Sequence, residues 1–226
     1  MPRATKNLVI TLDGPAGAGK STVAQGLAKR LGITYLDTGA MYRALTLKAL
    51  RLGVDLTNED ALAKLAQKTK IDFKKKPDGL HVTLDGEDVA KAIRTPEVTN
   101  NTFYVARVPK VRALMVGWQK AMGQGRSLVT DGRDQGTVVF PQARYKFYVD
   151  ADFEERFQRR LKELRIAGKP FDEAQLRADM KDRDQKDFTR AVGPLKKADD
   201  AIVIDSTGLT VDGTVEKILK YITVNF

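Results

Sequence analysis

The sequence of 226 residues is 42% hydrophobic and 30% charged and contains no cysteine, which is ordinary for one globular domain and excludes disulfides and thiolate chemistry. Its formal net charge of +10 is typical of proteins that bind nucleic acid, but the sequence has no RNP, zinc-finger or basic-helix signature that would support such binding. Residues 1–7 are too short and polar for a signal peptide, and no apolar run approaches the roughly 20 residues that span a bilayer. We therefore expect a cytoplasmic protein without a membrane or nucleic-acid partner.

Strands and helices are predicted to alternate from the first apolar run onwards. Residues 7–12 are mostly β-branched and aliphatic and end at a glycine-rich turn, which is typical of a buried strand that leads into a helix. From Lys20, apolar residues recur at helical spacing until Gly32 ends the segment. Further buried strands are expected at 34–36, 127–130, 145–149 and 201–204. The pattern predicts an α/β fold with a five-stranded parallel sheet flanked by helices.

Residues 71–89 depart from this alternation. Two runs of alternating polarity flank Pro77-Asp78-Gly79, and Asp85-Gly86 supplies a second turn. This pattern predicts a small antiparallel β insertion on the side of the core.

The segment after the fourth predicted strand is rich in arginine. Residues 153–170 predict a helix that breaks at Gly168-Lys169-Pro170, and a second charged helix is expected from Asp172 to about Asp187. We interpret residues 153–172 as a helical lid. The whole chain is then one domain, with a core of 1–37 and 105–226 and an insertion of 38–104.

The turn after the first strand matches the Walker A pattern, in which two glycines five positions apart precede lysine and serine or threonine. The matching residues, with the threonine that follows them, are Gly14, Pro15, Ala16, Gly17, Ala18, Gly19, Lys20, Ser21 and Thr22. Glycines allow backbone N–H groups to surround a phosphate at the start of a helix, while Lys20 can reach its oxygens. Because the match lies between a strand and a helix, it predicts a P-loop NTPase fold that binds ATP.

A carboxylate ends the strand predicted at 127–130. Asp131 follows an apolar run, as a Walker B aspartate does, although strands often end in aspartate without such a role. Together with the hydroxyl of Ser21, Asp131 is our candidate for holding Mg²⁺.

Arginines near loop ends favour a phosphoryl-transfer enzyme over a nucleotide-dependent switch or motor. Phosphoryl transfer requires positive charge around the transferring group, and one arginine can contribute about 10³- to 10⁵-fold in rate. Any single arginine is equally consistent with a surface ion pair of little energetic value. The candidate catalytic cations are Lys20, Arg43, Arg133, Arg159, Arg160, Arg183 and Arg190.

Four segments together resemble one enzyme family, the bacterial cytidylate kinases. They are the P-loop, Tyr35 to Arg43, Asp131 to Pro141, and Arg183 to Val192. The resemblance covers essentially the whole chain, including the predicted insertion, which is similar to the monophosphate-binding insertion of that family. It implies an enzyme that transfers the γ-phosphoryl group of ATP to CMP or dCMP, with Mg²⁺ as cofactor. We expect this enzyme to be a monomer.

The resemblance also implies an acceptor site. The positions that correspond to CMP-binding residues of the family are Asp37, Thr38, Arg43, Thr102, Arg112, Arg133, Asp134, Arg183 and Asp187. Asp134 and Arg112 supply an acceptor and a donor for the pairing edge of cytosine. One position departs from the family: Phe103 stands where a small hydroxyl residue is expected near the base, so its neighbour Thr102 is the candidate.

Two other functions stay open on the residues alone. A related kinase would act on another small acceptor such as UMP, AMP or shikimate. A non-catalytic P-loop protein would use its positive charge to bind nucleic acid.

Overall fold

The structure, a computed structural model, describes residues 7–76, 79–166, 168 and 171–222. The chain divides into two compact units, each with its own apolar core. The first unit is made of Met1–Leu36 and Gly123–Phe226, and the second is the continuous segment Asp37–Met122.

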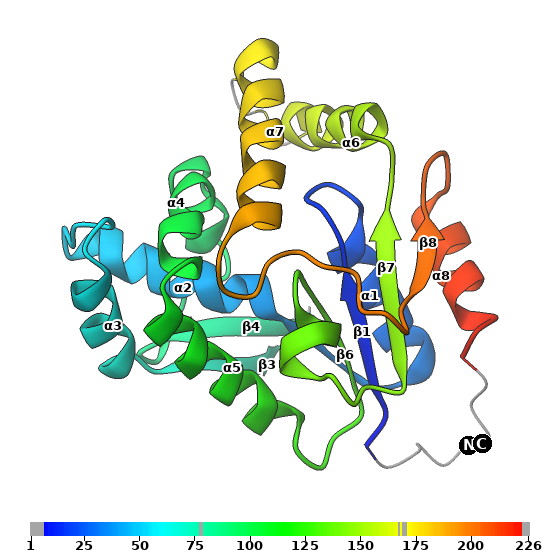
Figure 1. The fold of residues 1–226 in the computed structure, drawn as a ribbon, viewed down its shortest axis with the longest axis horizontal. Helices are drawn as coiled ribbons and strands as arrows, with labels where there is room; N and C mark the ends of the chain where they lie inside the picture. Colours follow the sequence, from blue (N-terminus) through cyan, green and yellow to red (C-terminus); the bar gives the residue numbers. More distant parts are fainter. Residues whose placement is uncertain (1–6, 77–78, 167, 169–170, 223–226) are drawn as a thin grey trace. The chain divides into compact units, whose positions relative to one another are not determined.

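The first unit contains the predicted five-stranded sheet, whose strand order is β2-β6-β1-β7-β8. Figure 1 shows β1, β7 and β8 of this sheet side by side. Strand β1 lies in the middle and pairs in parallel with β6 and β7, while β7 pairs in parallel with β8. The five strand predictions are thereby confirmed. The strands are β1 (Val9–Asp13), β2 (Thr34–Asp37), β6 (Leu128–Gly132), β7 (Tyr145–Asp150) and β8 (Ile202–Asp205).

Helices α1 (Lys20–Leu31) and α8 (Val211–Leu219) pack with these strands in the core of the first unit. Val23 and Leu27 recur at helical spacing on α1 and are buried, as the sequence pattern predicts. Gly32 ends α1 in the left-handed conformation at φ 64°, and its N–H bonds to the carbonyl of Ala28. At the other end of the helix, the chain enters directly from the P-loop.

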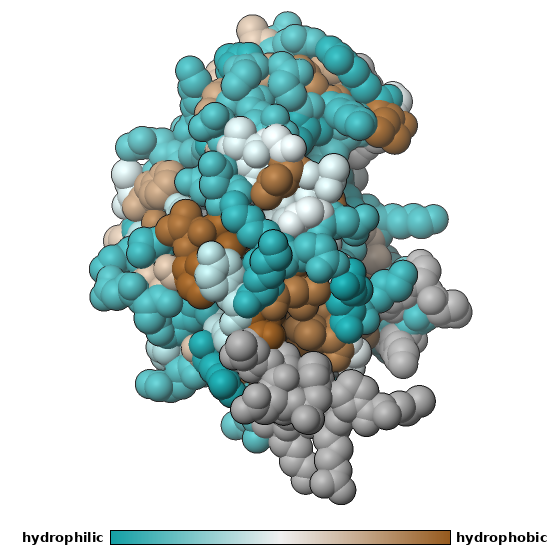
Figure 2. Space-filling view, turned by 90° about the vertical axis from the view of Figure 1, so that its right-hand side faces the viewer, coloured by the Kyte–Doolittle hydropathy of each residue, from teal (hydrophilic) through white to brown (hydrophobic). Residues whose placement is uncertain are grey.

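Strand β8 forms one edge of the sheet, and its two faces differ in exposure. Ile204 is fully buried, whereas the neighbouring Val203 is 53% exposed. Figure 2 views the side of the molecule on which β8 and α8 lie, and it shows apolar side chains gathered among hydrophilic ones there. Alternation along an edge strand thus brings some apolar surface to the outside of this unit.

The predicted arginine-rich helices are α6 (Phe153–Ile166) and α7 (Glu173–Thr189), which lie beside each other after β7 (Figure 1). Asp172 caps α7 by accepting a hydrogen bond from the N–H of Gln175 at 2.7 Å. The two helices share a small apolar cluster around Phe157, Leu161 and Met180. Residues 169 and 170 of the predicted break lie outside the described residues.

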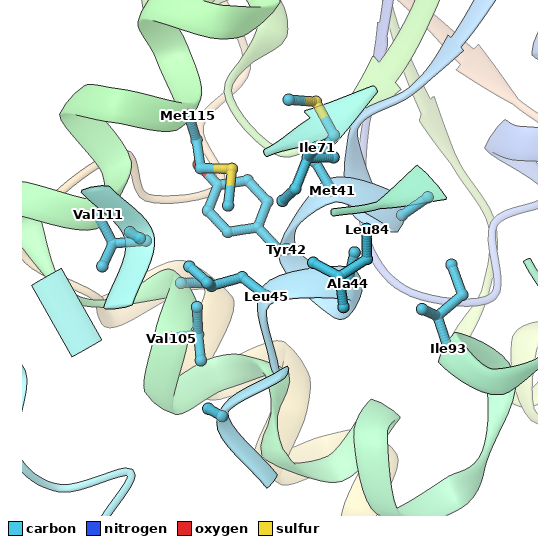
Figure 3. Close-up of a cluster of buried hydrophobic side chains, with 14 of the residues drawn as sticks. Met41, Tyr42, Ala44, Leu45, Ile71, Leu84, Ile93, Val105, Val111 and Met115 are labelled. Carbon is cyan, nitrogen blue, oxygen red and sulfur yellow. The ribbon is translucent and has the colours of Figure 1, made fainter. Parts of the chain in front are cut away.

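The described residues of the second unit form four α-helices, a short 3₁₀ turn and a three-stranded sheet. The helices are α2 (Thr38–Arg51), α3 (Glu59–Gln67), α4 (Pro96–Ala106) and α5 (Pro109–Gly123), and the turn is Ala92–Arg94. The close-up in Figure 3 shows its core, in which Met41 and Leu45 of α2 lie among side chains from the sheet, α4 and α5. Trp118 of α5 packs against this core, as the helical spacing predicts.

The antiparallel insertion predicted at 71–89 is confirmed. Strands β3 (Ile71–Lys76), β4 (Gly79–Leu84) and β5 (Glu87–Asp88) pair in sequence order. The Asp85-Gly86 turn between β4 and β5 has both residues at positive φ, 50° and 94°. The turn predicted at Pro77-Asp78 lies outside the described residues.

Candidate active site

The P-loop between β1 and α1 has the backbone that its glycines permit. Gly14, Gly17 and Gly19 have φ values of 147°, 79° and 80°, which residues with a Cβ rarely adopt. A Cβ on Gly14 would lie 2.0 Å from the carbonyl oxygen of Val149, so the chain passes β7 too closely for any side chain. This loop opens directly into α1, which is the arrangement that binds phosphate in P-loop proteins.

Lys20 is the first residue of α1, and its side chain is held inside the loop. It is 5% exposed, and its Nζ donates a hydrogen bond to the carbonyl oxygen of Pro15 at 2.5 Å. Burial lowers the pKa of Lys20, Arg133 lowers it further, and Asp131 opposes both. The predicted phosphate-binding cation therefore shares its surroundings with charged groups at the end of β6.

Asp131 lies near the carboxyl end of β6 and connects to the P-loop through hydrogen bonds. Its Oδ2 accepts the hydroxyl of Ser21 at 2.9 Å, and its Oδ1 accepts the phenol of Tyr35 at 2.7 Å. The two candidate Mg²⁺ ligands are thus brought together. The part of the chain that the structure describes has no group of three or more His, Cys, Asp or Glu side chains able to hold a metal.

A charged cluster joins the end of β6 to α7. Nε of Arg133 donates to Oδ2 of Asp187 at 2.6 Å, and a guanidinium nitrogen of Arg190 lies 3.6 Å from Oδ1. Burial alone would raise the pKa of Asp187, but Arg133, Arg183 and Arg190 together hold it below its usual value. Three of the predicted cations therefore meet around one predicted carboxylate.

Two of the predicted cations, Arg159 and Arg160, lie in the proposed lid, and their surroundings differ. Arg159 donates to the carbonyl of Ser206 at 2.6 Å and to its hydroxyl at 3.1 Å, and its Nε bonds to Glu155. Arg160 pairs with Glu163 one turn along α6. Arg159 is thus fixed against the loop after β8, whereas Arg160 makes a local ion pair on its own helix.

Arg156 connects α6 to the P-loop, and the sequence reasoning missed it. Its guanidinium donates to the carbonyl of Ala16 at 3.0 Å and to Asp184 on α7 at 2.6 Å. A Cβ on Gly17 would lie 3.1 Å from the Cβ of Arg156, so the loop and the helix are in close contact. One signal could have identified Arg156 as a candidate: it lies one turn before Arg160 in the helix that was already predicted to form part of the lid.

In the second unit, the start of α2 brings together Asp37, Thr38 and Arg43. Asp37 caps α2 by accepting the N–H of Ala40 at 2.8 Å, and it also accepts hydrogen bonds from Arg43 at 3.1 and 3.2 Å. Thr38, the first residue of the helix, is buried. Asp37 therefore fixes both the helix terminus and the guanidinium that we predict to bind the acceptor phosphate.

The predicted base-contacting residues of the second unit lie on α4 and α5. Arg112 is 3% exposed, donates to the carbonyl of Ala106 at 3.1 Å and lies over the ring of Tyr42. The Thr102 hydroxyl donates to the carbonyl of Val98 at 2.7 Å within α4. The ring of Phe103 packs edge to face against Tyr104, and Arg107 lies 5.9 Å from its centre.

Comparisons with known proteins show which family the chain belongs to. The family model for cytidylate kinase matches residues 10–224. A cytidylate kinase of Anoxybacillus flavithermus is 50% identical over 214 residues, covering 95% of each chain. A cytidylate kinase of Solibacter usitatus is 48% identical over 219 residues, covering 96% of this chain and 93% of the relative.

A comparison of folds gives a more distant likeness. The crystal structure of an uncharacterized protein from Eubacterium ventriosum aligns with a TM-score of 0.54 at 15% identity, covering 96% of this chain and 98% of that one. That likeness supports the fold alone. The family model spans the P-loop, Asp131, Arg133 and the antiparallel insertion, so the chain belongs to the cytidylate kinase family.

Proposed function

We propose that the chain transfers the γ-phosphoryl group of ATP to CMP or dCMP, giving ADP and CDP or dCDP, as part of pyrimidine nucleotide metabolism. The observation that carries the proposal is the cytidylate kinase family match over residues 10–224, which includes a complete P-loop and the Arg133-Asp134 segment. A kinase acting on UMP or AMP would use the same donor site and differ at the base contacts.

The donor site is assigned to the P-loop, residues 14–22. Its backbone is suited to the β-phosphate, and Lys20 is placed to neutralise charge on the β and γ oxygens. We assign no general base, because loose phosphoryl transfer depends mainly on positioning and electrostatic stabilisation. Arg159, Arg160, Arg183 and Arg190 are assigned to stabilising the transferring group.

Mg²⁺ is assigned to Ser21 and Asp131. These side chains are 2.9 Å apart and present a hydroxyl and a carboxylate, the hard oxygen ligands that Mg²⁺ prefers. Two protein ligands are sufficient, since Mg²⁺ in such sites keeps several waters and binds phosphate oxygens. When bound, the ion neutralises charge that develops on the phosphate groups.

The acceptor site is assigned to three sets of side chains, which contact the phosphate, the cytosine and the ribose. Thr38, Arg43 and Arg133 are assigned to the phosphate of CMP. Arg112 and Asp134 are assigned to the cytosine, with Thr102 as a further candidate. The ribose is assigned to Asp187, together with Arg183. In this assignment residues 38–104 form the monophosphate-binding insertion, and residues 153–172 form a lid that excludes water before transfer.

We further propose that the enzyme works as a cytoplasmic monomer and does not bind nucleic acid. Within the described ranges, none of the helices combines the length and apolar character needed to cross a membrane.

Initial rates of ADP formation with CMP, dCMP, UMP and AMP test the proposed function. CMP and dCMP are expected to give the highest kcat/KM, because the amino group of cytosine donates a hydrogen bond where the uracil oxygen can only accept one. The assay needs each acceptor at several concentrations with saturating ATP. A clear preference for AMP would overturn the assignment.

Replacing Arg43 by alanine tests the acceptor phosphate site. The KM for CMP is expected to rise on the order of 10- to 100-fold, because a charged hydrogen bond to the phosphate is lost, while the KM for ATP changes little. Arg51→Ala on the same helix is the matched control, since Arg51 forms an exposed pair with Glu87. An equal rise in both Michaelis constants would contradict the assignment of Arg43.

A further inference from the structure

We propose that Asp13, the last residue of β1, is a positioning residue that holds the loop carrying Arg133 and Asp134 in place beside the P-loop. One of its carboxylate oxygens accepts the N–H of Gln135 at 2.8 Å, and the other accepts the N–H of Gly136 at 2.7 Å. Both bonds are buried, and Asp13 is 4% exposed. The inference rests on the proposed function, in which Asp134 contacts the cytosine.

Gln135 and Gly136 begin a short π-helical turn (Gln135–Val139) immediately after Asp134. The residue that precedes the turn is Asp134, and its side chain makes no capping hydrogen bond to it. Asp13 supplies the cap from a neighbouring strand instead, more than 120 residues away in the chain. The carboxylate of Asp134 is therefore not used to close the turn that positions it.

The turn approaches β1 closely at Gly136, so an added methyl group there would have to displace its neighbours by a few tenths of an ångström. A Cβ on Gly136 would lie 3.0 Å from the hydroxyl oxygen of Thr11 and 3.3 Å from Oδ2 of Asp13. On the other side, Asp13 is followed by Gly14, which passes β7 without room for a side chain. Asp13 therefore belongs to the segment that forms the P-loop and is hydrogen-bonded to the segment that carries Arg133 and Asp134.

The charges around Asp13 are consistent with this role. Burial raises the pKa of Asp13 to about 6, the two backbone N–H groups lower it, Asp134 raises it and Lys20 lowers it. Lys146 also lies near the turn, and its Nζ pairs with Asp200 at 2.7 Å. At neutral pH the ionised form prevails, so both oxygens are available as acceptors.

Asp13→Asn tests the proposal with little change in shape. An amide has one acceptor oxygen, so one of the two N–H groups loses its partner and the turn is expected to loosen. We expect the preference for CMP over UMP, measured as the ratio of kcat/KM values, to fall about tenfold. The KM for ATP is expected to stay within about threefold of the parent.

Gly136→Ala disturbs the same contact between Asp13 and the turn, but it changes the turn and leaves Asp13 intact. Its methyl group should displace the turn by a few tenths of an ångström, with the same loss of preference. Thr11→Val is the matched control: it changes a buried side chain on the same strand but keeps both Asp13 hydrogen bonds, so the preference should be unchanged. Hydrogen exchange at the Gln135 and Gly136 amides should accelerate in Asp13→Asn and not in Thr11→Val.

The outcomes separate this inference from the proposed function. A parent enzyme that does not prefer CMP would remove the proposed function and with it the role of Asp13. With a CMP-selective parent, unchanged amide exchange in Asp13→Asn, or an unchanged preference in a folded variant, would overturn the inference alone. An equal fall in kcat/KM for CMP, UMP and ATP would also overturn the inference, because such a fall would indicate a general structural role for Asp13.

Discussion

Replacing Lys20 by alanine is expected to lower kcat by about 10³-fold while the protein remains folded. The side chain is enclosed by the loop that we assign to the triphosphate, so its charge acts where phosphate oxygens become more negative in the transition state. Burial already lowers the pKa of Lys20, which means that the protein gains no large stabilisation from this cation. The free energy of unfolding should therefore change by no more than about 1.5 kcal/mol.

The measurement is a steady-state assay with saturating ATP and CMP, accompanied by thermal unfolding. Lys29→Ala serves as the control, because Lys29 lies on the same helix with an exposed side chain. It should retain the parental kcat. A kcat for Lys20→Ala within tenfold of the parent would contradict the assigned role of the lysine.

Arg133→Ala is expected to lower kcat/KM for CMP by about 10³-fold, because the variant loses a guanidinium assigned to the acceptor phosphate. It also removes the closest partner of Asp187, a buried carboxylate bonded to Arg133 at 2.6 Å. We expect a loss of about 3 kcal/mol in the free energy of unfolding, since breaking a buried pair leaves a charge behind. The assay must therefore run well below the lowered Tm.

Arg133→Lys separates catalysis from stability. A lysine keeps a positive charge near Asp187, so the unfolding free energy should change much less than in the alanine variant. Its single ammonium cannot bind a phosphate with two parallel hydrogen bonds, so kcat/KM for CMP should still fall at least about tenfold. Arg165→Ala, at an exposed pair with Glu173, should match the parent in both measurements. Parental activity in Arg133→Lys would count against phosphate binding by this residue.

The parts of the fold that were predictable from the sequence depend on local determinants. The first strand, the P-loop and α1 follow one another within 25 residues, and glycine marks both ends of the helix. The antiparallel insertion was also predictable, because the alternation of polar and apolar residues and the Asp85-Gly86 turn are short-range signals. The π-helical turn after Asp134 was not predicted, since its cap comes from Asp13 in another strand.

The residues of the candidate site likewise fall into two groups, those that local motifs indicate and those whose contacts are distant in the sequence. Lys20, Ser21, Arg43 and Arg133 lie in contiguous motifs and were predicted from them as site residues. Arg156 was missed because its partners, Ala16 and Asp184, lie 140 and 28 residues away, so the only signal in its own helix was its spacing from Arg160. Tyr35 was also missed as a partner of Asp131, although both residues lie on strands whose ends were predicted. Such contacts arise only when the sheet brings distant segments together.

The division of the chain into two units has a consequence for how the enzyme loses its structure. The core around Met41 and Leu45 belongs entirely to Asp37–Met122, and the core around Ile10 and Phe147 belongs entirely to the other unit. Two separate cores allow two steps of unfolding, so one unit can open while the other persists. A substitution that weakens the core around Leu45 would then first disrupt the segment that carries Thr38 and Arg43, which we assign to the acceptor phosphate, in molecules whose P-loop is still folded.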